Sequence, residues 1–280
     1  MSTKALKTQL LAAIAMVLVA GIALGSSTYA WFASNNKVTA TGMEVQAQAE
    51  GGIEIAYTKS TETTATYQTS ATAGVTTAAA LAPTSTLDTS AWYHASAQTA
   101  NASTAKDDTR KTLTLNETAM SAPSNYGSLG GDDTVSYYMV QNFNIRSTTP
   151  SALAKGLTVD SVSVAGNTAD MSKALRVAIK LGTKVLIYNP TSDTASTYEV
   201  YSGYTAGAAT KAGTVNCIGK DTATLLADTA TTEIPAKGTT NNGGVDVQVY
   251  VYFEGEDTNL YTDAFKAEGL KVTVNFSATV

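Results

Sequence analysis

The clearest structural signal in this chain is an alternating segment near its C-terminus, Val245-Asp246-Val247-Gln248-Val249-Tyr250-Val251-Tyr252-Phe253. A second alternating segment follows a turn-rich stretch, Leu270-Lys271-Val272-Thr273-Val274-Asn275-Phe276-Ser277-Ala278. Alternation with a period of two residues is typical of a strand that buries one face. We therefore predict core strands over 245–253 and 270–280. The odd-numbered valines of the first and the even-numbered apolar residues of the second are expected to face inward.

Shorter segments of the same character occur throughout the chain, at 43–49, 53–57, 135–145, 157–164, 175–181 and 185–188. Two regions, near 58–133 and 189–240, are instead rich in Thr, Ser, Ala and Gly and carry few large apolar residues. We interpret them as long insertions between core strands, or as additional exposed strands. The pattern predicts an all-β fold, a jelly-roll-like β-sandwich that forms one domain over 43–280.

The N-terminus has the features of an export signal. Lys4 and Lys7 precede an apolar run over 10–24, which ends in Gly25-Ser26-Ser27-Thr28-Tyr29-Ala30. A short basic region, an apolar core and small residues at a cleavage site make a secretory signal peptide. We predict a signal helix over 1–30, cleavage between Ala30 and Trp31, and an N-terminal extension over 31–42. The alternative is an uncleaved anchor, and both readings place the bulk of the protein outside the cytoplasm.

The composition points away from several classes of site. Loss of residues 1–30 removes two lysines and no acids, so the formal charge moves from −5 to −7. An acidic chain without basic clusters is not expected to bind nucleic acid. With one histidine, His94, and one cysteine, Cys217, the chain is not predicted to be an enzyme. No cofactor is predicted, and the one weak metal possibility is calcium held by carboxylates around Gly255, at Glu254, Glu256 and Asp257.

The segment Gly25-Ser26-Ser27-Thr28-Tyr29-Ala30-Trp31-Phe32 resembles the TasA/camelysin family of exported bacterial proteins. The following Val38-Thr39-Ala40-Thr41-Gly42-Met43-Glu44-Val45 is similar to that family's first strand. This resemblance implies a jelly-roll subunit that is exported through a signal peptidase and builds biofilm-matrix fibres or pili by donor-strand exchange. The Thr/Ala-rich insertions depart from the family pattern, and the chain lacks the ligands for the metalloprotease activity linked to camelysin.

From the resemblance we expect a structural subunit that polymerises with copies of itself, outside a bacterial cell or on its surface. Contact with a membrane is expected only before cleavage. The donor segment would comprise Trp31, Phe32, Ala33, Val38 and Ala40, completing the sheet of the next subunit by β-augmentation. One alternative is a membrane-anchored monomeric adhesin or carbohydrate-binding protein that uses the two insertions. A secreted hydrolase has the least support of the three.

Overall fold

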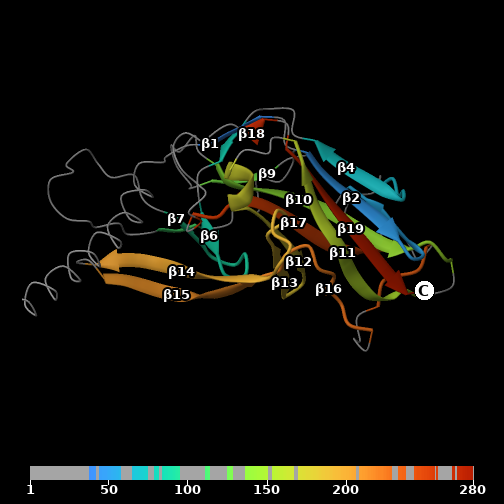
Figure 1. Cartoon of the computed structure of the whole chain (residues 1–280). Helices are drawn as coiled ribbons and strands as arrows, with labels where there is room; N and C mark the ends of the chain where they lie inside the picture. Colours follow the sequence, from blue (N-terminus) through green and yellow to red (C-terminus); the bar gives the residue numbers. More distant parts are fainter. Residues whose placement is uncertain are drawn as a thin grey trace, which may run out of the picture.

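The structure is a computed structural model of the chain (Figure 1). It describes residues 38–41, 44–57, 65–74, 79–81, 84–94, 111–113, 125–128, 136–150, 153–166, 170–205, 208–228, 233–237, 243–255, 257, 267–268 and 270–279. The predicted signal segment and its cleavage site therefore lie outside the described residues. The same holds for Trp31, Phe32 and Ala33 of the expected donor segment and for Glu256 of the calcium candidate.

Most of the described residues lie in two larger sheets (Figure 1). Sheet A has the order β13 (Lys184–Tyr188), β12 (Leu175–Leu181), β17 (Val245–Phe253), β10 (Ser136–Ser147), β5 (Ala79–Leu81), β1 (Val38–Thr41) and β18 (Ala267–Glu268), with β3 (Ile53–Ala56) and β9 (Asn125–Ser128) also paired to β10. Sheet B has the order β16 (Ala223–Thr224), β11 (Lys155–Ala165), β19 (Lys271–Thr279), β2 (Glu44–Glu50) and β4 (Ser70–Gly74). The chain crosses repeatedly between them.

The two sheets enclose the main hydrophobic core, so the predicted all-β sandwich is confirmed. Both alternating C-terminal segments form strands of this core, one in each sheet. Val249 in β17 and Val274 in β19 are fully buried, which confirms the predicted inward faces. The largest fully buried side chains of this core are Tyr188, Phe143, Phe253, Phe276, Ile53, Ile55, Met139, Ile145 and Leu157.

Local features follow the sequence closely. The segments 175–181 and 185–188 form the antiparallel pair β12–β13 around Gly182, whose φ of +59° suits glycine. The slipped alternation over 157–164 corresponds to β11, where the pairing with β19 shifts between Val159 and Ser161. The β2–β3 turn contains Gly51 (φ +67°), and a Cβ there would lie 2.4 Å from the carbonyl oxygen of Ala278. This position therefore requires glycine.

The expectation that β17 buries only one face is wrong for its second half. Tyr250 and Tyr252, which point away from the main core, are also buried, because a second cluster covers the outer face of sheet A. Trp92 is the centre of this cluster: its ring stacks on Tyr138 at 4.2 Å and meets Tyr252 edge-on at 5.0 Å. Aromatic rings in such arrangements add to the stabilisation from burial alone.

The cover over sheet A comes from the two Thr/Ser/Ala-rich regions. The first contributes a small sheet of β6 (Ser85–Thr86), β7 (Trp92–His94) and β8 (Lys111–Leu113). The second contributes the hairpin β14 (Ser196–Thr205) and β15 (Ala208–Cys217), which extends beyond the sandwich in Figure 1. The two pieces meet closely, since a Cβ on Gly213 would lie 2.9 Å from the Leu87 side chain. These insertions therefore build a second core as well as exposed strands.

Candidate assembly strand and buried charge cluster

Part of the expected donor segment lies at the margin of sheet A. Val38 and Ala40 belong to β1, which pairs antiparallel with β5 and parallel with β18. In this register Thr39 lies opposite Ala80, and Ala40 lies opposite both Ala79 and Ala267. The strand character predicted for this segment is thus present, and its backbone is paired within the same chain.

This margin is joined to the rest of sheet A by few backbone contacts. The β1 strand has three residue pairs with β5 and two with β18. Among the pairings of described residues, β5 then meets β10 at one position, Ser136 with Leu81. The central pair β10–β17, in contrast, has eight residue pairs. Among the described residues, the β5–β1–β18 unit is thus joined to β10 through this one residue pair.

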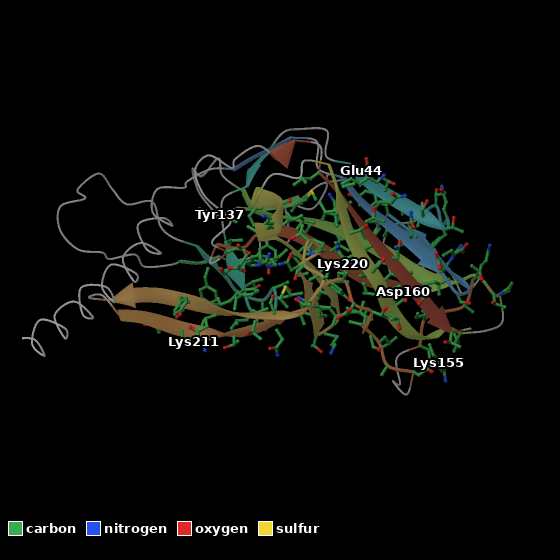
Figure 2. The ribbon with its side chains drawn as sticks, viewed as in Figure 1. Glu44, Tyr137, Lys155, Asp160, Lys211 and Lys220 are labelled. Atoms are coloured by element: carbon green, nitrogen blue, oxygen red, sulfur yellow. The ribbon has the colours of Figure 1, made fainter. Side chains whose placement is uncertain are left out.

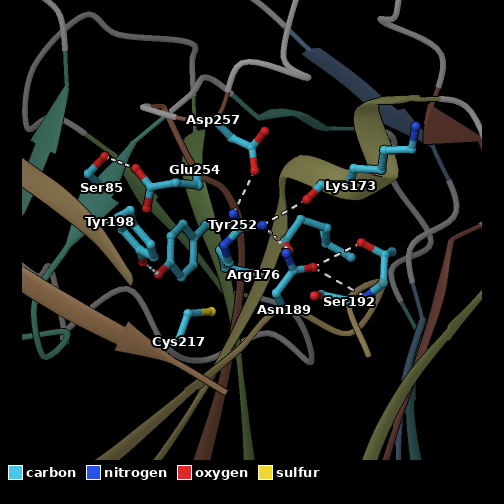
Figure 3. A network of polar contacts seen from close by, with 12 residues as sticks. Ser85, Lys173, Arg176, Asn189, Ser192, Tyr198, Cys217, Tyr252, Glu254 and Asp257 are labelled. Atoms are coloured by element: carbon cyan, nitrogen blue, oxygen red, sulfur yellow. Dashed lines mark hydrogen bonds and ion pairs between the residues drawn. The ribbon is translucent and has the colours of Figure 1, made fainter. Parts of the chain in front are cut away.

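Two of the three calcium candidates belong instead to a buried charge cluster (Figure 3). The Arg176 guanidinium donates to Asp257 Oδ2 at 2.6 Å and to the backbone oxygens of Lys173 and Leu175. Glu254 is fully buried and accepts a hydrogen bond from the Ser85 hydroxyl. The cluster ties β12 and the turn after β17 to β6 of the covering layer.

The single guanidinium of Arg176 faces two carboxylates in this cluster. Burial alone would lower the pKa of Arg176, but the carboxylates of Glu254 and Asp257 hold that pKa above its ordinary value. Next to them, Tyr198 of the β14–β15 hairpin and Tyr252 of β17 have their hydroxyls 3.2 Å apart. Burial raises the pKa of both tyrosines well above the ordinary value. A compensated ion pair of this kind is costly to break, because each partner would be left as a buried charge.

These contacts bear directly on the calcium prediction. A cation at Glu254 and Asp257 would have to displace the Arg176 guanidinium and the Ser85 hydroxyl, which already engage the two carboxylates. Within the described residues, no group of three or more His, Cys, Asp and Glu side chains is arranged to hold a metal ion. Calcium binding at this turn stays a prediction, and its third candidate ligand, Glu256, is not described.

The single cysteine and the single histidine of the chain lie in different strands of the layer that covers sheet A, β15 and β7. Cys217 is buried at the end of β15, and this burial raises the pKa of its thiol to about 11. A thiol with so high a pKa is protonated near neutral pH and is a poor nucleophile. His94 lies in β7 with Lys111 opposite it in β8.

Within the described residues, no helix has the length and apolar character needed to span a membrane.

Sequence reasoning missed the charge cluster. Its signal was present as Arg176, a charged residue between Leu175 and Val177 near the start of a largely apolar segment. A charge in such a position is rarely buried unless it is paired. Its partners lie about 80 residues away in sequence, after the other half of the β12–β17 pair, so the pattern alone does not name them.

Comparison with known proteins adds no relative to this picture. No protein-family model, no curated protein and no solved structure matches the chain. The functional argument therefore depends on the sequence and on the geometry described above.

Proposed function

We propose that this chain is a structural subunit of an extracellular fibre or pilus of the bacterial biofilm matrix. In this proposal the protein is secreted, loses residues 1–30 to a signal peptidase, and polymerises head-to-tail by donor-strand exchange of its mature N-terminus. It acts as a structural protein and not as an enzyme, and its partner is a second copy of itself. The support comes from the export signal, the resemblance of residues 25–45, and the position of β1.

The observation that carries the proposal is the placement of β1 at the loosely joined margin of sheet A. If the β1 strand of one subunit lay between β5 and β18 of the next, the same backbone pairs would form between subunits as form within one chain. Such an exchange changes the connectivity and conserves the hydrogen bonds, as in domain swapping. It also keeps the neighbouring strands from becoming open sheet edges, which pair indiscriminately.

The length of the extension is sufficient for exchange. Ten residues over 31–40 span about 33 Å when extended, at roughly 3.3 Å per residue. That reach allows the segment to leave its own sandwich and lie along the sheet of a neighbour. Because donor and acceptor are different surfaces, the contact is head-to-tail and does not close on itself, so repetition builds a filament. Trp31 and Phe32 would anchor the tip of the donor segment in this arrangement.

Deletion of residues 31–40 from the mature chain tests the proposal. We expect a folded monomer with the β-rich circular dichroism of the intact protein and no filaments in electron microscopy. The matched control removes the same number of residues, 97–106, from the Ser/Thr/Ala-rich region and is expected to leave polymerisation intact. Filaments of normal appearance from the 31–40 deletion would show that the donor segment lies elsewhere.

A further inference from the structure

The outer face of sheet B differs from that of sheet A in both chemistry and exposure. Its outward side chains are half-buried or exposed, and they form rows across four strands. One row contains Ser163, Thr273, Gln46 and Thr72, and the next contains Ser161, Asn275, Gln48 and Ser70. These two central rows carry no charge, in a chain whose formal charge is −5.

One polar atom at the centre of this face lacks a partner. The Asn275 amide donates to the Ser161 hydroxyl at 2.7 Å, while its carbonyl oxygen Oδ1 is buried and accepts no hydrogen bond. An unpaired buried acceptor is unfavourable, and such groups are rare in folded proteins. On both sides of Asn275 along the row lie side chains that can donate and accept, Ser161 and Gln48.

The charges of the face lie outside the two central rows, on β2, on β19 and at Asp160 of β11, whose carboxylate accepts a hydrogen bond from the Ser277 hydroxyl at 2.8 Å. The acids Glu44 and Glu50 lie on β2, and the cation Lys271 lies on β19. Because the two strands run parallel and in register, Glu44 lies next to Lys271. Lys271 and Glu44 form an ion pair of 2.9 Å across the two strands. Figure 2 shows Glu44 at one end of the sheet and Lys155 near the other.

We propose that this face binds the same face of a second copy of the chain, related by a two-fold axis that runs parallel to the strands between β2 and β19. This axis places β19 of one copy over β2 of the other. Lys271 then faces Glu44 of the second copy, Thr273 faces Gln46 and Asn275 faces Gln48. Each of these three contacts joins a donor to an acceptor or a cation to an anion. In the same pairing Ser277 of one copy faces Glu50 of the other, beside the carboxylate of Asp160.

The size of the face indicates what this contact does. Seven paired residues on four strands cover about 23 Å by 19 Å, or roughly 440 Å² per copy. A stable interface buries about 800 Å² per partner, so a single contact of this size is weak. When two filaments lie side by side, the first contact holds the next subunits close together. The following weak contacts then form at a high effective concentration, and the total affinity increases. The face is therefore suited to joining fibres side by side, a step beyond the head-to-tail assembly proposed above.

The test uses two isosteric changes at the centre of the face, Gln48→Glu and Asn275→Asp. Positions 48 and 275 face each other between the two copies and are also paired within each chain, so the double variant creates two like-charge contacts between copies and one within each chain. We expect bundles to separate into single filaments of unchanged length, and self-association to weaken about tenfold or more. The control Thr197→Glu/Thr210→Glu adds the same charge to exposed positions of the β14–β15 hairpin and should leave bundles intact.

Swapping the charges of Lys271 and Glu44 at the end of the face provides a second test, in which a double variant should restore the association that a single variant loses. Lys271→Glu alone should weaken lateral association, and Lys271→Glu/Glu44→Lys should restore it, because both the intramolecular and intermolecular pairs return with reversed sign. Electron microscopy gives the bundle width, and sedimentation equilibrium gives the dimer constant of any unpolymerised protein. If no filaments form but wild-type protein dimerises through this face, donor-strand exchange fails and this inference stands. Equal self-association of the wild type and the central double variant would overturn the inference. So would a double variant that associates normally with itself and loses only its binding to a matrix polysaccharide.

Discussion

The outer faces of sheets A and B differ in side-chain chemistry and in burial, although the strands of both sheets show the same alternating sequence pattern. In β17 of sheet A the residues that point away from the main core include Tyr250 and Tyr252, and these are buried under a second layer. In β19 of sheet B the corresponding residues are Thr273, Asn275 and Ser277, which are half-buried, and within the described residues no second layer covers them. Alternation identifies the strand in both cases and does not say how many faces are covered.

The difference lies in the chemistry of the outward residues. Tyrosine has a large apolar ring with a polar tip, so it tolerates water and also supports a core when another element covers it. Threonine, serine and asparagine side chains offer little apolar area and keep a sheet face solvated. The described strands of the Thr/Ser/Ala-rich regions accordingly cover the aromatic face of sheet A and not the hydroxyl and amide face of sheet B.

A buried charge gives the largest expected effect on stability and tests the inward faces of both sheets. Val274→Asp places an unpaired carboxylate in the main core and should destabilise the protein by more than about 4 kcal/mol. The adjacent Thr273→Asp, on the outer face of sheet B, should change the free energy of unfolding by less than about 0.5 kcal/mol. Urea denaturation of the two variants gives the comparison, and similar losses would contradict the assignment of faces.

Removal of the central aromatic residue tests whether the covered face of sheet A is a true second core. Trp92→Ala should destabilise the protein by about 3–5 kcal/mol, because its ring contacts Tyr138, Tyr250 and Tyr252. Hydrogen exchange should also show faster opening of the β14–β15 hairpin. A cost below 1 kcal/mol, as expected for the outer-face change Ser163→Ala, would mean that the cover contributes little to stability.

Two ion pairs with similar N···O distances allow the contribution of a buried pair to stability to be compared with that of an exposed pair. Arg176→Met leaves Asp257 and Glu254 without their guanidinium partner and should cost about 3 kcal/mol. Lys211→Met removes a similarly short pair, with Glu199 on the exposed hairpin, and should change stability far less because water screens that pair. Thermal unfolding of both variants tests this, and an equal cost would show that the cluster in Figure 3 gains nothing from burial.

The smallest expected effect is the alkaline response of Cys217. Its pKa in the folded protein is about 11, above the ordinary value of 9.0, because the thiol is buried. The unfolded thiol therefore loses its proton first, and this contribution to stability is present below pH 9 and is lost between about pH 9 and 11. The slope is at most about 1.4 kcal/mol per pH unit. Cys217→Ala should flatten the decline in stability over this range, and an unchanged slope would contradict the assignment.

The sequence was sufficient for features determined locally. Alternation located β17 and β19, and Gly182 marked the turn between β12 and β13. The second core was not predicted, because Trp92 lies in a weakly patterned region and its ring partners are far away in sequence. The parallel pairing of β2 with β19 joins segments more than 200 residues apart in sequence and leaves no signal in the pattern of either segment. Long-range pairing of this kind appears only when the chain is folded.

The most direct test of donor-strand exchange is disulfide trapping between two differently tagged subunits in a Cys217→Ala background. One carries Thr39→Cys and the other Ala80→Cys, positions that lie opposite each other in the β1–β5 pair. Residues directly opposite in an antiparallel ladder have Cα atoms about 4.5–5.5 Å apart, within reach of a disulfide. We predict that mixed filaments yield a covalent dimer with one copy of each tag, and that neither variant alone does. Filaments that form from the mixture without this dimer would contradict the exchange of β1.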